Sequence, residues 1–447
     1  MNEVTTTYWC EHAWLGGDRA VSKVQVDVRD GRVAGVHTGI DDPPAGSRNR
    51  RGLTLPGLAN GHSHVFHRAL RGRTHAGTGS FWTWREAMYE VAARLDPDSL
   101  HALARATYGE MVLAGFTCVG EFHYVHLDPG GKPYADPNAM GEALVAAAAD
   151  AGIRITLLDV CYLHGGIGRE LEPGQRRFSD GSVDAWIRRV SDRRWTDHAR
   201  SGAAVHSVRA CTPEEIAQVA TWSELQRLPL HAHVSEQPAE NEDCRAAYGR
   251  TPTEVLHDAG ALADRFTAVH ATHLTDDDVR LLGEARTAVC LCPTTERDLA
   301  DGIGPAGRLA SAGVRLTVGS DSQAMIDGLE EARSVELDER LVTGLRGTFD
   351  AARLMTTLAE DGHCSLGWPD AGRIAVGQRA DLVTVALDSV RLAGSDLAST
   401  LDAVVFGATA ADITDVTVDG VDVVEGGEHR GIGVAAELAA AIGEVTP

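Results

Sequence analysis

The sequence predicts an α/β protein, a (β/α)8 TIM-type barrel with a small β-sandwich domain built from both chain termini. Eight short apolar runs of strand character recur along the middle of the chain, each followed by a longer helical or loop stretch. The two ends instead show short alternating runs with tight-turn signals, which are typical of hairpins. On the alternation of strands and helices alone, a doubly wound open sheet is the alternative.

The length of 447 residues allows two domains, or one barrel with additions. We expect residues 1–55 to form the N-terminal part of the β-domain and residues 56–371 to form a metal-dependent barrel. Residues 372–447 then supply the C-terminal part of the β-domain and an Ala-rich terminal helix. Asp-Gly pairs at 30–31 and 419–420 mark a hairpin turn in each half of the β-domain.

The barrel elements follow from apolar runs and from helix start and stop signals. The predicted strands are residues 52–58, 117–122, 153–162, 203–210, 229–234, 266–271, 287–291 and 315–319. The clearest helices between them are residues 98–114, 140–151, 213–227, 251–259 and 276–284. Good N-cap or N1 residues stand at Asp98, at Thr212 before Pro213, and at Thr275. Glycines stand where helices would end, at 115, 152, 260 and 313.

Composition excludes several classes of protein. Asp and Glu outnumber Lys and Arg by 64 to 41, and the net charge of −23 argues against nucleic acid or an anionic membrane as a partner. No run of about 18 apolar residues is present to span a bilayer. The start of the chain lacks the pattern of a signal peptide, and the eight cysteines are scattered, so we expect a reducing cytoplasm. Cys290 and Cys292 lie in an apolar run and are predicted to be core thiols.

Histidine and aspartate residues come at the ends of four predicted strands. They are His62 and His64 after the first strand, His231 and His233 in the fifth, His270 in the sixth and Asp321 after the eighth. Side chains two residues apart on a strand point to the same side, and the active sites of such barrels lie at the C-terminal strand ends. The sequence therefore predicts that these motifs converge on a metal ion.

The same motifs carry a family resemblance. Residues 55–64 (Leu-Pro-Gly-Leu-Ala-Asn-Gly-His-Ser-His), His233, His270, Asp321 and the segment 372–382 (Gly-Arg-Ile-Ala-Val-Gly-Gln-Arg-Ala-Asp-Leu) resemble the amidohydrolase superfamily. The resemblance covers essentially the whole chain. It implies a barrel with one divalent ion held by His62, His64, His233 and Asp321, and it places His270 close to the metal-bound water. Zinc is the expected ion, and iron or manganese would suit the same ligands.

The lysine count bears on the number of metal ions. Binuclear members of the superfamily use a carboxylated lysine at the end of strand four, and this chain has lysine only at positions 23 and 132. Neither lies in the fourth predicted strand, so we expect a mononuclear site. Glu236, three residues after His233, resembles the acid of mononuclear deaminases and is predicted to protonate the leaving nitrogen. A solvated loop acid is the alternative interpretation of Glu236.

Other segments are similar to formimidoylglutamate deiminases, namely residues 81–89, 121–126, 206–209, 233–242 and 291–302. In that family the positions of Arg85, Tyr124, His206 and Arg209 bind the glutamate part of the substrate. Arginine suits a dicarboxylate because it binds carboxylate through two parallel hydrogen bonds. Arg85 and Arg209 could also be ordinary ion-pair partners. His67 stands where the family pattern has glutamine, and both side chains can donate and accept one hydrogen bond.

The sequence thus predicts metal-dependent hydrolysis of N-formimino-L-glutamate to N-formyl-L-glutamate and ammonia, a step of histidine degradation. In this hypothesis His270 and Asp321 accept the proton of the attacking water and Glu236 protonates the departing nitrogen. A deaminase of the same superfamily that acts on guanine, a triazine or an adenosine-like ring is the alternative. A metal-free scaffold relative is a further class, and a homodimer is expected from the resemblance. His123, His126 and His273 receive no role.

Overall fold

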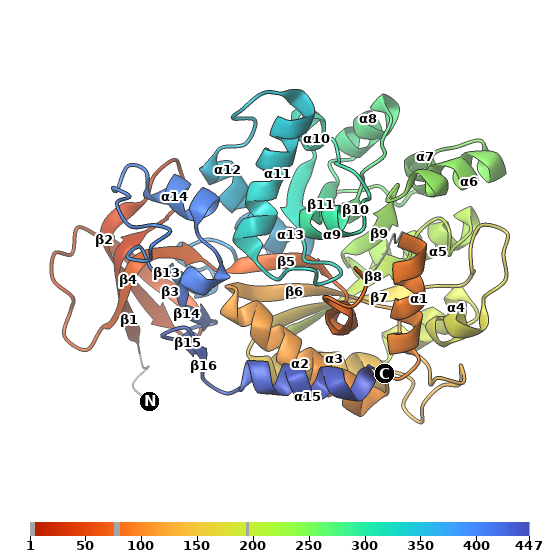
Figure 1. Ribbon diagram of the computed structural model, residues 1–447, viewed down its shortest axis with the longest axis horizontal. Helices are drawn as coiled ribbons and strands as arrows, with labels where there is room; N and C mark the ends of the chain where they lie inside the picture. The colour runs from red at the N-terminus through yellow and green to blue at the C-terminus, as the bar shows by residue number, and fades with distance from the viewer. Residues whose placement is uncertain (1–4, 76–80, 194–195, 447) are drawn as a thin grey trace.

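The computed structural model describes residues 5–75, 81–193 and 196–446, and its strands form two separate sheets (Figure 1). One sheet consists of parallel strands in sequence order: β5 (Leu58–Ser63), β6 (Phe116–His123), β7 (Arg154–Cys161), β8 (Ala199–Val205), β9 (Leu230–Val234), β10 (Phe266–His270), β11 (Ala288–Leu291) and β12 (Arg315–Val318). A parallel bridge between Ser63 and Asp321 joins the first strand to the segment after the last. The sheet therefore closes on itself, which confirms the predicted eight-stranded barrel.

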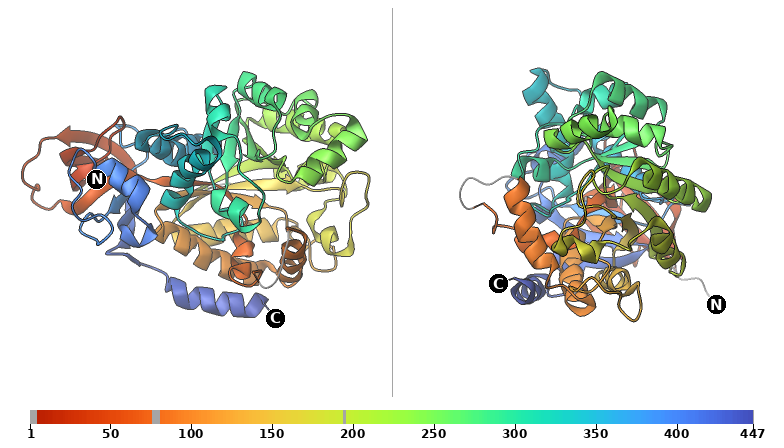
Figure 2. Two further views of the ribbon diagram at one scale, coloured as in Figure 1. Left: turned by 45° about the horizontal axis from the view of Figure 1, so that its top comes forward. Right: turned by 90° about the vertical axis from the view of Figure 1, so that its right-hand side faces the viewer.

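Helices surround the barrel, as the two views of Figure 2 show. The five predicted helices are α2 (Pro97–Leu113), α3 (Ala139–Ala151), α5 (Pro213–Gln226), α7 (Pro252–Asp258) and α8 (Asp276–Glu284). Thr212 and Thr275 are N-caps whose side chains accept from the third backbone N–H of the helix. Helix α2 begins one residue earlier than expected. Asp96 rather than Asp98 is its N-cap, and Pro97 takes the first helical position.

The remaining helices complete the outer layer and the C-terminal region. They are α1 (Phe81–Ala92), α4 (Val183–Ser191), α6 (Pro238–Tyr248), α9 (Pro293–Asp298), α10 (Ala306–Ser311), α11 (Gly328–Thr343), α12 (Ala351–Thr356), α13 (Gly362–Ser365), α14 (Thr400–Gly407) and α15 (Val434–Val445). The predicted terminal helix is α15, which lies along α2 (Figure 1). Within the described ranges, no helix is both long enough and apolar enough to cross a membrane.

Both ends of the chain build the second sheet. Its strands are β1 (Thr6–Ala13), β2 (Val21–Arg29), β3 (Arg32–Thr38), β4 (Arg48–Pro56), β13 (Leu382–Val385), β14 (Ile413–Val418), β15 (Val421–Glu425) and β16 (Glu428–His429), in the order β16-β15-β14-β13-β4-β1-β2-β3. The antiparallel pairing of β13 with β4 joins the two terminal segments. Both predicted hairpin turns are present, and Asp30, Gly31, Asp419 and Gly420 all have positive φ, as a tight two-residue turn requires.

Two predicted strands, the first and the fourth, have wrong boundaries, and the fourth begins at Ala199 rather than at residue 203. Residues 52–56 belong to β4 of the terminal sheet, and the first barrel strand begins only at Leu58. One continuous apolar run therefore passes from one sheet to the other, and the change occurs at Gly57. Only glycine fits at this position, because a Cβ there would lie 2.3 Å from Thr117 Oγ1. The fourth strand ends at Val205 rather than at residue 210, since the chain turns where Ala210 N donates to Ser207 O over 3.0 Å.

The cysteines of the structure are all free thiols. Cys290 and Cys292 are fully buried and form a small apolar cluster with Val269, in line with the predicted core environment. Cys292 also lies within 4.8 Å of His270 and Glu296, so this cluster borders the mouth of the barrel.

Candidate active site

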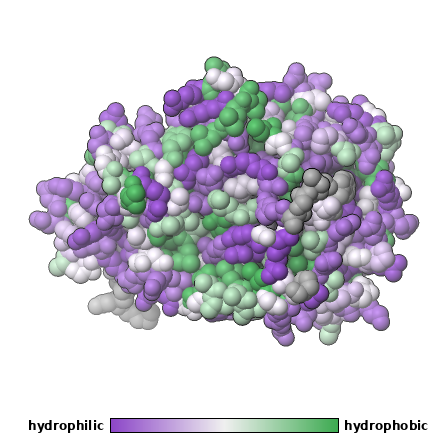
Figure 3. Space-filling view, viewed as in Figure 1, coloured by the Kyte–Doolittle hydropathy of each residue, from purple (hydrophilic) through white to green (hydrophobic). Residues whose placement is uncertain are grey.

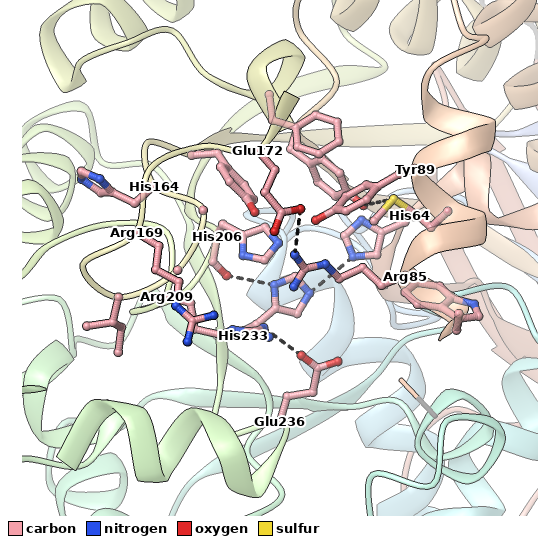
Figure 4. Close-up of a pocket in the computed structure, with 18 of the residues that line it drawn as sticks. His64, Arg85, Tyr89, His164, Arg169, Glu172, His206, Arg209, His233 and Glu236 are labelled. Atoms are coloured by element: carbon pink, nitrogen blue, oxygen red, sulfur yellow. Dashed lines mark hydrogen bonds and ion pairs between the residues drawn. The ribbon is translucent and has the colours of Figure 1, made fainter. Parts of the chain in front are cut away.

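The segments that follow the barrel strands surround a cavity of about 280 Å³ at the C-terminal ends of the strands (Figure 4). Its lining includes most of the residues singled out from the sequence, namely His64, His67, Arg85, Tyr124, His206, Arg209, His233, Glu236 and Asp321. His62 and His270 lie beneath it and are almost fully buried. The sites predicted on separate strands are therefore brought to one place by the closed sheet.

Three histidines and one aspartate form a tight cluster at the base of this cavity. Nitrogen or oxygen atoms of His62, His64, His233 and Asp321 all lie within 4.8 Å of one another. His62 Nε2 is 3.1 Å from His64 Nε2, and His64 Nε2 is 3.4 Å from His233 Nε2. Asp321 Oδ1 lies 3.4 Å from Nε2 of both His62 and His64.

The outer ring nitrogens of His64 and His233 indicate which of their atoms face inward. His64 Nδ1 lies 3.1 Å from the carbonyl oxygen of Phe122, and His233 Nδ1 lies 2.9 Å from that of His206. Since a carbonyl only accepts, each Nδ1 carries the proton and each Nε2 presents a lone pair to the cluster. Lone pairs this close repel one another unless a cation lies between them. Tetrahedral bonds of about 2.0–2.1 Å to zinc place neighbouring ligand atoms about 3.3–3.4 Å apart, so the cluster fits such an ion.

Burial lowers the pKa of His62, His64 and His233 well below the usual range, and the neighbouring imidazoles lower it further. The neutral form is the one that binds metal. His231 lies two residues before His233 on the same strand, but it is not part of the cluster. Its Nε2 bonds the carbonyl oxygen of Ser365 over 3.2 Å, lower in the barrel.

A second group of ligand-type residues lies elsewhere in the barrel wall, where His123, His126 and Asp159 are buried together. Asp159 already accepts from Arg189 over 2.8 Å, and it lies 2.6 Å from Arg193 Nη1. Two guanidinium groups neutralise this carboxylate and would repel a further cation. We therefore interpret this group as a structural network.

Glu236 is buried beside the cluster and is held by an arginine. Arg209 Nη2 donates to Glu236 Oε2 over 3.0 Å, and the backbone N–H of Glu236 donates to Glu240 Oε2 over 3.1 Å. Burial raises the pKa of the Glu240 carboxyl, and the charge of Arg209 partly offsets that effect. Arg209 was predicted to lie at the end of the fourth strand, near His206, and to bind a substrate carboxylate there. In the structure it follows the end of β8 and directly contacts the predicted proton donor.

His270 lies between three carboxylates. Its Nδ1 is 3.3 Å from Glu296 Oε1, and its Nε2 is 3.9 Å from Glu236 Oε1 and 3.8 Å from Asp321 Oδ2. Burial alone would lower the pKa of His270, but the hydrogen bond to Glu296 and the charges of Glu236 and Asp321 outweigh it and raise this pKa well above the usual value. Glu296 is a functional candidate that sequence reasoning missed, although it stands in a segment noted for its resemblance.

A group of rings forms the wall of the cavity beside the cluster. His67 Nε2 lies 3.0 Å from the hydroxyl oxygen of Tyr124, and burial lowers the pKa of His67 to about 3, so this ring is neutral. The ring of His206 lies against those of Tyr162 and His233, with centroids 4.7 and 5.0 Å away. Tyr162 was not predicted, because an aromatic residue at the end of a buried strand also suits the core.

The outer wall carries two further arginines (Figure 4). Arg85, on α1, lies 3.9 Å from Glu172 Oε2, and its guanidinium stands over the ring of Tyr89 at 5.2 Å. Arg169 lies in the segment after β7, lines the cavity and is exposed. Its position between glycines and polar residues gave no functional signal in the sequence. The cavity therefore presents guanidinium groups from three separate segments.

The closed barrel and the histidine–aspartate cluster at its mouth define a hydrolase of the amidohydrolase class. Residues 53–423 match the amidohydrolase family, and the chain belongs to this family. It is 38% identical over 400 residues to the formimidoylglutamate deiminase of Pseudomonas aeruginosa, covering 86% of this chain and 88% of that protein. The 8-oxoguanine deaminase of the same organism is 29% identical over 429 residues, 92% of each chain. A solved amidohydrolase from Brucella melitensis has 34% identity and a TM-score of 0.91, covering 98% of this chain and 99% of that one.

Proposed function

We propose that this protein hydrolyses N-formimino-L-glutamate to N-formyl-L-glutamate and ammonia, a reaction of histidine degradation. The observation that carries the proposal is one cavity that combines a histidine–aspartate cluster with guanidinium groups of Arg85, Arg169 and Arg209. The substrate needs both features, because its formimino carbon must be attacked by water and its two carboxylates must be bound. The relative from Pseudomonas aeruginosa, a formimidoylglutamate deiminase at 38% identity, supports the same activity.

His62, His64, His233 and Asp321 would hold one divalent ion. We assign zinc, because three imidazoles and one carboxylate suit it, although iron or manganese binds the same donors. When bound, the ion supplies Lewis acidity that lowers the pKa of a water molecule to about 7. The chain has lysine only at positions 23 and 132, and neither lies on the barrel strands, which supports a single ion.

The protein groups around this cluster supply the proton transfers. Asp321 Oδ2 and His270 Nε2, which lie 3.8 Å apart, are placed to accept the proton of the attacking water. The water oxygen adds to the carbon of the protonated formimino group, whose terminal nitrogen already carries two hydrogens, and one water proton goes to Asp321 and His270. The other water proton passes from the new hydroxyl through Glu236 to the terminal nitrogen, and the oxygen it leaves forms the formyl C=O. The bond from the carbon to that nitrogen then breaks and ammonia leaves. Without this proton the nitrogen would be a poor leaving group, so Glu236 is essential to the step.

The remaining lining residues would bind the glutamate part. Arg85 and Arg209 offer forked donors for carboxylate, and Arg169 adds a third cation at the exposed rim. Tyr124 and His206 line the same cavity, with ring centroids 5.8 Å apart, and would supply further polar atoms. His67 bonds Tyr124, so we assign to it the orientation of the tyrosine hydroxyl. A planar ring substrate would have no use for several guanidinium groups.

A substrate panel tests the proposal. Zinc-loaded protein should release ammonia from N-formimino-L-glutamate faster than from N-formimino-L-aspartate or N-formiminoglycine, and should not act on guanine, adenosine or 8-oxoguanine. Equal or higher rates on the rings would overturn the assignment in favour of a ring deaminase. A matched variant, Glu236→Gln, should lose about 100- to 10,000-fold in turnover while it keeps its metal content. Protein that binds no divalent ion and stays inactive would instead indicate a scaffold relative.

A further inference from the structure

The backbone at His270 is held in a conformation that most residues avoid. His270 ends β10 with φ of 66° and Ala271 follows with φ of 51°, both in the left-handed region. The turn is fixed by a hydrogen bond of 3.0 Å from Ala271 N to Val234 O. Strain of this kind persists only where the surroundings determine it, and it gathers at functional sites. The strand end is thus built to direct one imidazole.

The two ring nitrogens of His270 have different surroundings. Nδ1 lies 3.3 Å from Glu296 Oε1, within reach of a hydrogen bond. Nε2 has no hydrogen-bond partner in the described part of the chain, although the residue is only 1% exposed. It faces Glu236 Oε1 at 3.9 Å and Asp321 Oδ2 at 3.8 Å. Nδ1 is therefore held by Glu296, while Nε2 faces the two carboxylates that take part in the proposed proton transfers.

Glu296 is itself fixed. It lies in α9 directly after β11, is 5% exposed, and its Oε1 also accepts from the backbone N–H of Cys292 over 2.8 Å. An oxygen that already accepts one N–H is best matched by a second donor, so His270 presents Nδ1–H to it. The carboxylates around His270 favour its charged form, and a divalent ion held by the neighbouring cluster would oppose them. In the neutral ring, the proton on Nδ1 leaves a lone pair on Nε2, which a proton acceptor requires.

We propose that Glu296 is the positioning residue of this active site, acting through His270. It sets the rotation of the imidazole and keeps the proton on Nδ1, so that Nε2 faces the water, Glu236 and Asp321. This inference rests on the proposed function, since it assigns the partner of that reaction's proton acceptor. Glu296 does not line the cavity, and the hydrogen bonds of its carboxylate in the described part of the chain go to His270 and Cys292.

Turnover of the zinc-loaded protein on N-formimino-L-glutamate tests this role. Glu296→Gln should lower kcat by about 10- to 100-fold, because an amide no longer favours one tautomer of the ring, and should leave KM and zinc content within about threefold. Glu331→Gln is the matched control. Glu331 is also buried and accepts from Thr294 N at the start of the same helix over 3.1 Å, but among the described residues it has no hydrogen bond or ion pair with a histidine. It should change kcat less than threefold.

A double-mutant cycle separates positioning from mere support of the fold. In a His270→Asn background, Glu296→Gln should cost no further activity, because the residue through which it acts is gone. Equal losses in both backgrounds, or an unchanged kcat in the single variant, would overturn the inference. If the His270→Asn protein has no measurable turnover, equal losses in Glu296→Gln and Glu331→Gln overturn it and a selective loss in Glu296→Gln supports it. Wild-type protein inactive on this substrate would refute the proposed function instead.

Discussion

Arg209 has two roles in the proposed reaction, since it lines the substrate cavity and also holds Glu236 over 3.0 Å. Arg209→Ala should therefore lower kcat by about 10-fold or more and raise KM as well, because the proton donor loses a charge-assisted hydrogen bond. Arg85 lies on α1 and faces Glu172 at 3.9 Å, and Arg85→Ala should raise KM with a smaller change in kcat. Steady-state kinetics on N-formimino-L-glutamate checks both.

The metal content provides the control, because neither arginine belongs to the candidate ligand cluster. Both variants should retain wild-type zinc by elemental analysis. A variant Arg209→Ala whose kcat equals that of the wild type would show that the contact with Glu236 has no part in the reaction. Unchanged KM in both variants would remove the arginines from carboxylate binding.

His67 tests how a departure from the family pattern is accommodated. Its neutral ring bonds the Tyr124 hydroxyl over 3.0 Å, and a glutamine can make the same bond. His67→Gln should therefore keep KM within about threefold of the wild type. His67→Phe, which keeps a ring but cannot make the bond, should raise KM by about 2- to 10-fold. Similar KM values in the two variants would show that the Tyr124 contact is irrelevant.

At this scale the sequence predicts residues better than it predicts their partners. Strand geometry predicts that the strand-end motifs converge, and the family resemblance selected His62, His64, His233 and Asp321 from a set that also held His231. The pairs Arg209–Glu236 and His270–Glu296 were not predictable, because they join side chains 27 and 26 positions apart through loops with no fixed spacing. Only the packed barrel decides which acid each base meets.

The connection after β5 shows how an element is fixed around the candidate ligands. Glu121, near the end of β6, accepts from Ser63 Oγ over 2.7 Å and from Val65 N over 2.8 Å. These residues flank His64, and Gln323 Nε2 donates to the same Ser63 hydroxyl over 2.9 Å. One buried carboxyl therefore ties two strand ends to the segment that follows β12.

Glu121 also makes the stability of this element depend on pH. Burial raises its pKa from 4.5 to about 8, only partly offset by the hydrogen bonds from Val65 and Ser63. Between these values the folded state keeps a proton that the unfolded chain releases. The stability contribution of Glu121 must then fall as pH rises, by up to about 1.4 kcal/mol per pH unit. Glu121→Gln, which resembles the protonated form, removes this dependence.

Urea unfolding of both proteins at pH 5, 6, 7 and 8, with the same zinc supply, measures the effect. The difference in unfolding free energy, wild type minus variant, should decrease steadily over this range. All other titrating groups are common to the two proteins and cancel. A difference that stays constant with pH would show that Glu121 is ionised throughout.

The prediction of strands failed where one apolar run contains residues of two sheets or continues past a turn of the chain. The apolar run 53–58 looks like one strand, but β4 and β5 belong to different sheets. Likewise Val208 and Ala210 are buried, which suggests a continuing strand, although the chain has already turned after Val205. Burial is visible in a sequence as apolar residues, whereas the direction of the backbone is not.

At the scale of the whole molecule, net charge and local charge are separate properties. The chain carries a formal charge of −23, yet three arginines line one cavity of about 280 Å³. Hydrophilic residues cover much of the face in Figure 3, with hydrophobic residues gathered in places such as the end of α11, where Leu341 is 79% exposed. An acidic surface favours solubility, and in the proposed reaction the arginines inside the cavity bind the anionic substrate.

The barrel and the terminal sheet are held together at the opposite end from the active site. Arg154, at the start of β7, donates to Asp381 Oδ1 over 2.9 Å, and its second nitrogen also contacts this carboxylate. Both side chains are 1% exposed, and Asp381 Oδ1 accepts from Asp419 N over 2.9 Å in the terminal sheet. The buried guanidinium therefore pairs mainly with the aspartate that leads into β13, and its Nη1 also lies 3.2 Å from Asp419 Oδ1.

Asp381→Ala should lower the free energy of unfolding by about 3–5 kcal/mol, because it leaves the Arg154 charge buried without its main partner. Glu284→Ala is the control, since its ion pair with Arg280 is more than half exposed and is worth under about 1 kcal/mol. Chemical denaturation measures both changes. The folded fraction of Asp381→Ala should keep the wild-type KM, because the site lies at the other ends of the strands. Equal destabilisation by the two substitutions would mean that this buried pair does not join the two sheets.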